Sequence, residues 1–176
     1  MKTKTNELFN PRLVLSMKLL NQTGPIKLFP MISQYMKTLP KEQAAVVPLD
    51  KDKNVIGGLW ALSDGTDSRV MVDYESTLKW LKEIDAEYVV LAHNHPYITN
   101  QEEEGLENLN PSPDDVHTTM AVADKFREEG IQVLDAVIVG GGGDLVSITR
   151  TLENITLGIE AYEMEKLMWT LRKGLH

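Results

Sequence analysis

The sequence predicts an α/β fold in which a mixed central sheet is flanked by helices. Short apolar, β-branched runs alternate along the chain with segments whose apolar residues recur at helical spacing. Clusters of Gly, Pro, Asn and Asp separate these segments, as turns and loops do. With 176 residues, 42% of them hydrophobic, the chain can bury one core. We therefore expect one domain over 25–150, a basic N-terminal arm over 1–24, and a C-terminal helix over 151–176 for packing or dimerisation.

Each predicted element has a local signal. Strands are predicted where apolar and β-branched residues cluster between turn residues, at 44–49, 55–62, 69–72, 87–92, 131–139 and 145–148. Helices are predicted where apolar residues recur every three or four positions, at 31–39, 75–85, 113–129 and 151–173. The first two strands form a hairpin, and Pro48 predicts that the first is an edge strand or ends in a bulge. Gly130 closes the third helix as a C-terminal cap.

The predicted C-terminal helix has two overlapping apolar rows. One row starts at Leu152 and runs to Tyr162, and the other starts at Leu157 and runs to Leu171. A helix that is apolar over so wide an arc needs two surfaces to cover it. We expect its own sheet to cover one face and a second copy of the chain to cover the other, which predicts a homodimer.

Composition excludes several kinds of site. The chain has no Cys, so a disulfide scaffold, an iron–sulfur cluster, a Cys nucleophile and thiolate-bound zinc are excluded. Any metal must be held by His, Asp or Glu. The formal net charge is −8, divided between +6 over residues 1–41 and −14 over the remainder. An acidic body repels phosphate backbones, which disfavours nucleic-acid binding except through the basic arm. We favour an arm that lies on its own acidic body.

We expect a soluble, cytoplasmic protein with no membrane association. No apolar run approaches the ~18 residues of a membrane span. The most apolar N-terminal stretch, residues 13–20, is interrupted by Lys18 and is not followed by a small-residue cleavage site.

The strongest chemical signal is His93-Asn94-His95-Pro96, at the end of the predicted strand over 87–92. Residues i and i+2 of a strand project from the same face, about 6.6–6.8 Å apart along the chain. Two imidazoles at that separation can converge on one ion. Pro96 prevents the strand from continuing, so the pair is left at an edge or mouth of the sheet that a ligand can reach.

A third ligand must come from elsewhere, and the next polar cluster surrounds the start of the helix over 113–129. Ser112 and Asp115 form a capping box there, with Pro113 at the first helical position. This local role does not exclude metal binding, because Asp115 can still turn one oxygen toward a cation.

The two clusters together resemble the JAMM (MPN+) metalloprotease motif, H-x-H-P followed by S-x-x-D. The flanking segments look like the bacterial RadC-like branch of that superfamily: Leu91-Ala92 before the histidines, Pro111 before Ser112, and Leu134-Asp135-x-x-Ile138-Val139-Gly140. Upstream, Glu42-x-x-x-Val46-Val47-x-Leu49-Asp50 and Gly65-Thr66 also match in type and order. The resemblance covers about residues 25–150.

The resemblance implies a JAB/MPN core, which is similar to the cytidine-deaminase layout, and a zinc metallopeptidase or isopeptidase. Its zinc would be held by His93, His95 and Asp115, with water as the fourth ligand. Ser112 would stabilise the oxyanion, and Glu42 would be the general base, with Glu75 as a rival near a helix start. A deaminase itself is excluded because its zinc needs Cys ligands.

Two departures leave the substrate open. Seventeen positions separate His95 from Ser112, more than the usual spacer, and Tyr97-Ile98 replace the usual Ser-Gly. The polar loop over 97–111 is acidic, and it is either a flap, an acidic lip that selects basic substrates, or a solvated loop. The alternatives to a hydrolase are a metal-binding interaction module with weak catalysis and a DNA-repair-associated RadC-like protein.

Overall fold

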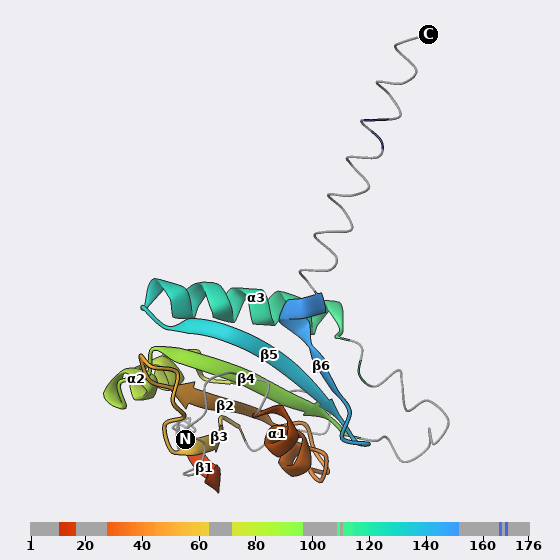
Figure 1. Cartoon of the computed structure of the whole chain (residues 1–176), viewed down its shortest axis with the longest axis horizontal. Coiled ribbons are helices and arrows are strands. Elements are labelled where there is room, and N and C mark those ends of the chain that lie inside the picture. The colour runs from red at the N-terminus through yellow and green to blue at the C-terminus, as the bar shows by residue number, and fades with distance from the viewer. Residues whose placement is uncertain are drawn as a thin grey trace, which may run out of the picture.

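The computed structural model describes residues 11–16, 28–63, 72–96, 109, 111–151, 166 and 168. Among these described residues, six strands form one sheet (Figure 1): β1 (Arg12–Ser16), β2 (Ala44–Leu49), β3 (Gly58–Ala61), β4 (Tyr88–His95), β5 (Gln132–Gly140) and β6 (Leu145–Ser147). Their order is β1-β3-β2-β4-β5-β6. Only the β4–β5 pair is parallel, and the other four pairs are antiparallel. The predicted mixed sheet of an α/β fold is therefore confirmed.

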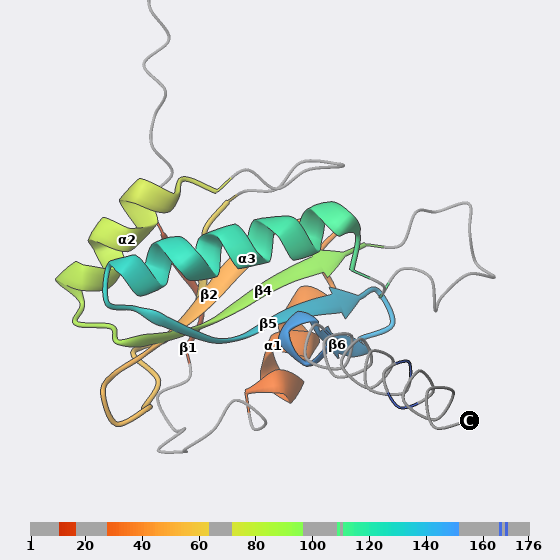
Figure 2. The same cartoon turned by 90° about the horizontal axis from the view of Figure 1, so that it is seen from above.

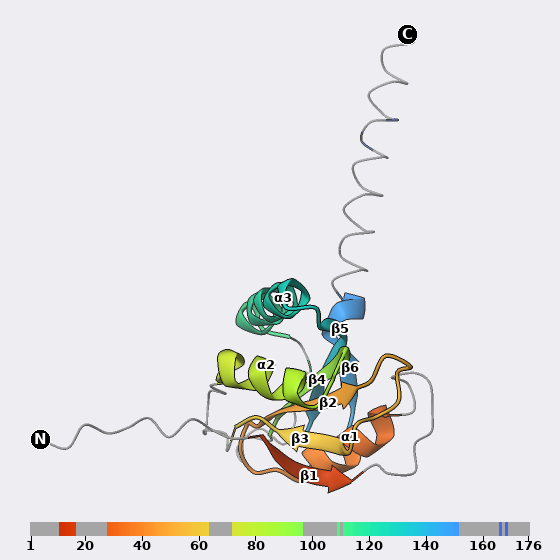
Figure 3. The ribbon, with the colours of Figure 1, turned by 90° about the vertical axis from the view of Figure 1, so that its left-hand side faces the viewer.

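Helices cover both faces of the sheet. Helix α1 (Phe29–Met36) lies on one face, whereas α2 (Tyr74–Glu83) and α3 (Pro113–Glu128) lie on the other (Figures 1 and 3). Neighbouring residues of one strand reach opposite cores, as the pleat requires. Val47 and Val90 pack with α1, whereas Val46 and Val89 pack with α2 and α3.

Helix α3 connects the two parallel strands and crosses above them (Figure 2). It begins where the sequence predicts, with Ser112 as N-cap and Asp115 completing a capping box. It ends just before Gly130, whose φ of +82° is one that L side chains rarely adopt. Buried Val122 and Phe126 anchor the helix on the sheet. The first turn of α3 is thereby held above the carboxyl ends of β4 and β5.

Three features of the sheet differ from the sequence prediction. Arg12–Ser16, within the predicted arm, pairs with β3 as an edge strand. Strand β4 continues through both histidines instead of ending at His93. Strand β2 is interior, so the first of the two alternatives predicted from Pro48, an edge strand, is wrong.

The structure tolerates Pro48 because the backbone N–H that proline lacks would lie where β2 pairs irregularly with residues 55–57, just before β3. In a strand the N–H and C=O of one residue point the same way, and the Pro48 carbonyl accepts from Ile56 at 2.8 Å. The absent Pro48 N–H would therefore also face Ile56. The Ile56 carbonyl accepts instead from the Gly58 N–H at 3.0 Å and from Trp60 Nε1 at 3.3 Å.

Several predicted segments fall mainly or wholly outside the described residues. They are most of the strand over 69–72, nearly all of the loop over 97–111 and most of the helix over 151–173. Within the described part of the chain, no helix combines the length and the apolar character needed to cross a membrane.

Candidate metal centre

Strand β4 carries His93 and His95 at its C-terminal end. Both follow the pleat of Val89, so they lie on the face covered by α2 and α3. Their Nε2 atoms are 3.2 Å apart, and their side chains are 21% and 15% exposed. Two ring nitrogens facing each other at this distance are stabilised by a shared proton or a shared cation.

Asp115 completes the group from the first turn of α3. Its Oδ1 lies 3.4 Å from His93 Nε2, and its Oδ2 lies 3.5 Å from His95 Nε2. The capping box fixes this orientation, because Asp115 Oδ2 accepts from the Ser112 N–H at 2.8 Å. The Asp115 N–H in turn donates to Ser112 Oγ at 3.0 Å. The helix start therefore aims the carboxylate at both imidazoles.

The surroundings keep Asp115 ionised. Burial alone raises the pKa of the carboxyl group. Hydrogen bonds from His93, from His95 and from the Ser112 backbone outweigh this effect and hold the pKa well below its ordinary value of 3.8. An ionised carboxylate beside two imidazole nitrogens is one of the donor sets that bind zinc.

The three ligand atoms suit a tetrahedral ion. All of them lie within 4.8 Å of one another. Zinc bonds of 2.0–2.1 Å in a tetrahedron place neighbouring ligand atoms about 3.3–3.4 Å apart. The 3.2 Å between the two Nε2 atoms is close to that spacing, and so is the approach of each histidine to one carboxylate oxygen of Asp115, 3.4 Å from His93 to Oδ1 and 3.5 Å from His95 to Oδ2. The residues therefore fit a zinc ion with two nitrogen ligands and one oxygen ligand.

The group opens into a cleft of about 580 Å³, which Glu42 and Ser112 also line. Glu42 lies two residues before Ala44, which pairs opposite His93, so the pairing of β2 with β4 brings Glu42 to the end of β4 that carries the histidines. Glu75, the rival base, is an exposed residue in the first turn of α2 and is not among the described residues that line the cleft.

The walls of the cleft combine polar and apolar groups. Leu62, Leu91 and Val122 line the cleft together with the polar residues. The Ser112 hydroxyl accepts a bond from the Asp115 backbone and can still donate its own proton, since a hydroxyl does both. His117, an exposed residue of α3, lines the same cleft but does not belong to the three-residue ligand group.

Sequence reasoning missed Asn94. This residue is only 1% exposed and sits between the two histidines on the face that packs against α1. Its side chain bonds the backbone of Lys41 and Gln43. An available signal was a polar residue continuing the buried row of Val90 and Ala92, because a buried amide must find hydrogen-bond partners.

Comparison with known proteins agrees with the resemblance seen in the motifs. A family model described as the RadC-like JAB domain matches residues 23–154. A UPF0758 protein of Photobacterium profundum is 32% identical over 119 residues, which is 68% of this chain and 48% of that protein. A UPF0758 protein of Symbiobacterium thermophilum is 31% identical over 120 residues, covering 68% and 47%. The chain thus spans about half the length of the curated relatives it matches.

Proposed function

The chain belongs to the RadC-like JAB domain family, which is MPN-related, and we propose that it is a zinc-dependent hydrolase of peptide or isopeptide bonds. The observation that carries the proposal is the group of His93, His95 and Asp115, with ligand atoms within 4.8 Å of one another. Three protein ligands leave one tetrahedral position for water, which is the arrangement of catalytic zinc.

The polar residues at the metal group have separate roles in this reaction. A bound zinc ion lowers the pKa of its water toward about 7. Glu42 accepts the proton of the attacking water and returns it to the leaving amine, as a general base and then a general acid. Ser112 donates its hydroxyl proton to the oxyanion that develops on the substrate carbonyl. Asp115 orients the two imidazole rings and places its negative charge beside them.

Metal content tests the ligand set. Element-specific analysis of protein purified without chelator is expected to find about one zinc per chain in the wild type. His95→Ala and Asp115→Ala are each expected to abolish stoichiometric zinc, because two ligands hold the ion far more weakly than three. His117→Ala and Asp114→Ala are the matched controls, since both residues line the cleft outside the ligand group. Unchanged zinc in the ligand variants would refute the proposal.

Turnover separates a hydrolase from an interaction module. Wild-type protein is expected to cleave members of a pool of fluorogenic peptides or an isopeptide-linked protein. Glu42→Gln should retain zinc and lose about 10²–10⁴-fold in rate, the usual contribution of a general base. Stoichiometric zinc without any cleavage would favour the metal-binding interaction module instead.

A further inference from the structure

Asn94 lies between the two candidate ligands in sequence but on the opposite face of β4. Successive strand residues point to opposite faces, so His93 and His95 meet the cleft while Asn94 points toward α1. Its side chain is almost fully enclosed, with 1% of the residue exposed. A buried amide is costly unless its oxygen and nitrogen both find partners.

The partners of Asn94 flank Glu42 on both sides. Asn94 Oδ1 accepts from the Gln43 N–H at 2.7 Å. Asn94 Nδ2 donates to the Lys41 carbonyl at 2.9 Å and approaches the Leu39 carbonyl at 3.5 Å. The Asn94 side chain therefore forms hydrogen bonds with the backbone of the residue before Glu42 and of the residue after it.

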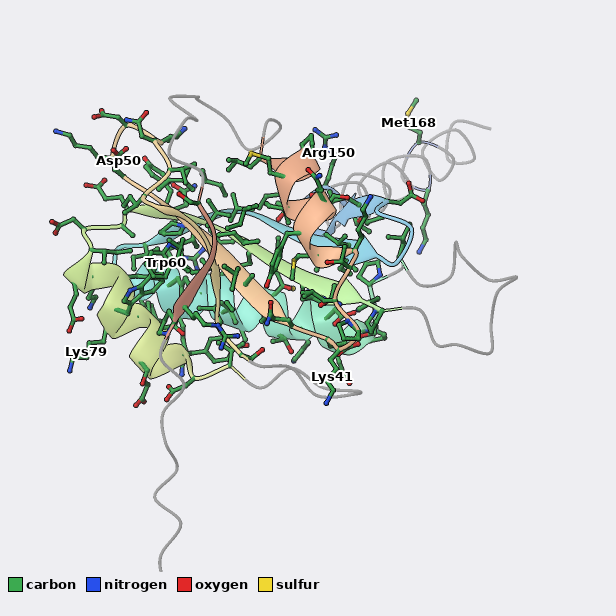
Figure 4. All side chains as sticks on the ribbon, turned by 90° about the horizontal axis from the view of Figure 1, so that it is seen from below. Lys41, Asp50, Trp60, Lys79, Arg150 and Met168 are labelled. Carbon is green, nitrogen blue, oxygen red and sulfur yellow. The ribbon has the colours of Figure 1, made fainter. Side chains whose placement is uncertain are left out.

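These hydrogen bonds lie where the regular pairing of β2 with β4 ends. The β2–β4 ladder runs from Leu49 opposite Tyr88 to Ala44 opposite His93. One residue farther along, the Gln43 N–H is bonded by the Asn94 side chain. Lys41 precedes β2 and Asp50 follows it, at opposite ends of the strand (Figure 4). The Gln43 side chain is itself held, because its Oε1 accepts from the Tyr35 hydroxyl at 3.2 Å.

We propose that Asn94 is a positioning residue that holds Glu42 in register with the metal-facing histidines. The inference rests on the proposed function, since it concerns the carboxylate assigned there as general base. Strand β4 then presents the two histidine ligands on one face, and the buried amide between them sets the position of the base from the other face. The two histidines and the base are thereby tied to one strand, whereas the third ligand, Asp115, comes from α3.

The test is a double-variant cycle on zinc-loaded, full-length protein. Asn94→Ala is expected to keep about one zinc per chain and to lose about 10²-fold in cleavage of the fluorogenic peptide pool, the cost of a 1 Å misplacement. In the Glu42→Gln background the same substitution should cause no further loss, because it acts through Glu42. A loss that is equally large without Glu42 would overturn the proposal.

A second readout does not depend on turnover. The protein is loaded with Co²⁺ in place of zinc, and the pH at which its visible absorption changes is measured. Asn94→Ala should shift this pH in the same direction as Glu42→Gln, and the double variant should show only the Glu42→Gln shift. If Glu42→Gln changes neither readout, the assigned base and this inference both fail. If Glu42→Gln changes both readouts and Asn94→Ala changes neither, only this inference fails.

A second substitution at Asn94 and a control substitution elsewhere complete the test. Asn94→Asp keeps the shape and the acceptor for Gln43 but loses the donor to Lys41, so it remains informative if Asn94→Ala does not fold. A smaller rate loss is expected, and it should again vanish in the Glu42→Gln background; persistence there would overturn the proposal. Asn54→Ala is the matched control, because it removes an amide that bonds Asp50 in the turn at the other end of β2. It should leave both readouts unchanged, and a loss matching that of Asn94→Ala would overturn the proposal.

Discussion

Ser112 takes part both in the start of α3 and in the cleft. Its Oγ accepts from the Asp115 N–H, and its own N–H donates to the Asp115 carboxylate. Capping and the proposed catalysis therefore draw on the same two side chains. The strength of the helix start and the aim of the carboxylate are set by one pair of hydrogen bonds, and a substitution at Ser112 acts on both.

Substitutions at Ser112 can separate these two roles. Ser112→Ala is expected to cost about 1 kcal/mol of unfolding free energy, the usual value of an N-cap. It should also slow peptide cleavage about 10²–10³-fold, as the loss of an oxyanion donor does. Ser112→Asp restores the cap but supplies no neutral donor, so stability should return while cleavage stays low. Urea unfolding and peptide cleavage measure the two effects, and recovery of both would contradict the oxyanion role.

At the scale of elements, the turn between β2 and β3 depends on the carboxylate of Asp50. Asp50 Oδ1 accepts from the backbone N–H groups of Asp52 and Asn54, each at 2.9 Å. The hydrogen bond from the Asn54 backbone is the main reason that the pKa of Asp50 lies below its ordinary 3.8. The charged form of this side chain therefore stabilises the folded hairpin.

The sign of its pH dependence follows from this lowered pKa. Asp50 contributes stability above the unfolded pKa of about 3.9, and the contribution is lost as the pH falls through the lower folded value. Asp50→Ala is expected to cost about 1 kcal/mol at pH 6, and the difference from wild type should narrow toward pH 3. Urea unfolding at both pH values checks this, and a gap that widens in acid would contradict it.

The packing of α3 on the sheet explains where Asp115 lies. Val122 and Phe126, buried against the sheet, fix the axis of α3, and the parallel pairing of β4 with β5 fixes the strand ends below it. His95 lies opposite Gly140 in that pairing. The carboxylate therefore reaches the histidines because a helix and two strands are packed as one unit.

At the scale of the whole molecule, charge separates the body from the first 41 residues. The body carries −14 and the N-terminal portion +6, so the charge distribution disfavours contact of nucleic acid with the body and favours contact with the N-terminal portion. Within that portion, Arg12–Ser16 pairs at the sheet edge beside β3. Part of the predicted arm is thus committed to the fold.

Duplex DNA of random sequence provides the test of the DNA-associated alternative. The full-length protein is expected to show no binding at 0.15 M salt, because the acidic body repels the phosphates. Any binding at low salt should weaken steeply as salt rises. Replacing Lys2 and Lys4 by Gln should flatten the log–log salt slope by up to about 1.8, at about 0.9 for each phosphate that is no longer neutralised. Tight binding that is independent of salt would contradict this expectation.

Local patterns were sufficient to predict most elements and the pair of histidines on one strand face, whereas Asp115 as the third candidate ligand followed from the resemblance of the motifs to a known family. The capping box at Ser112 and the C-terminal cap at Gly130 are confirmed, because such signals lie within a few neighbouring residues. The apolar run before His93 likewise predicted a buried strand. These features depend on hydrogen bonds and burial periods that the sequence records directly.

Tertiary structure alone decided how distant segments meet. The interior place of β2, the pairing of β1, and the approach of Asp115 to His93 and His95 all depend on contacts between segments far apart in the chain. The hydrogen bonds from Asn94 to the backbone on either side of Glu42 depend on such contacts as well. The sequence by itself determined which groups were available for chemistry. Their distances and partners required the packed sheet, because non-local pairing is set by the burial of the whole core rather than by local propensity.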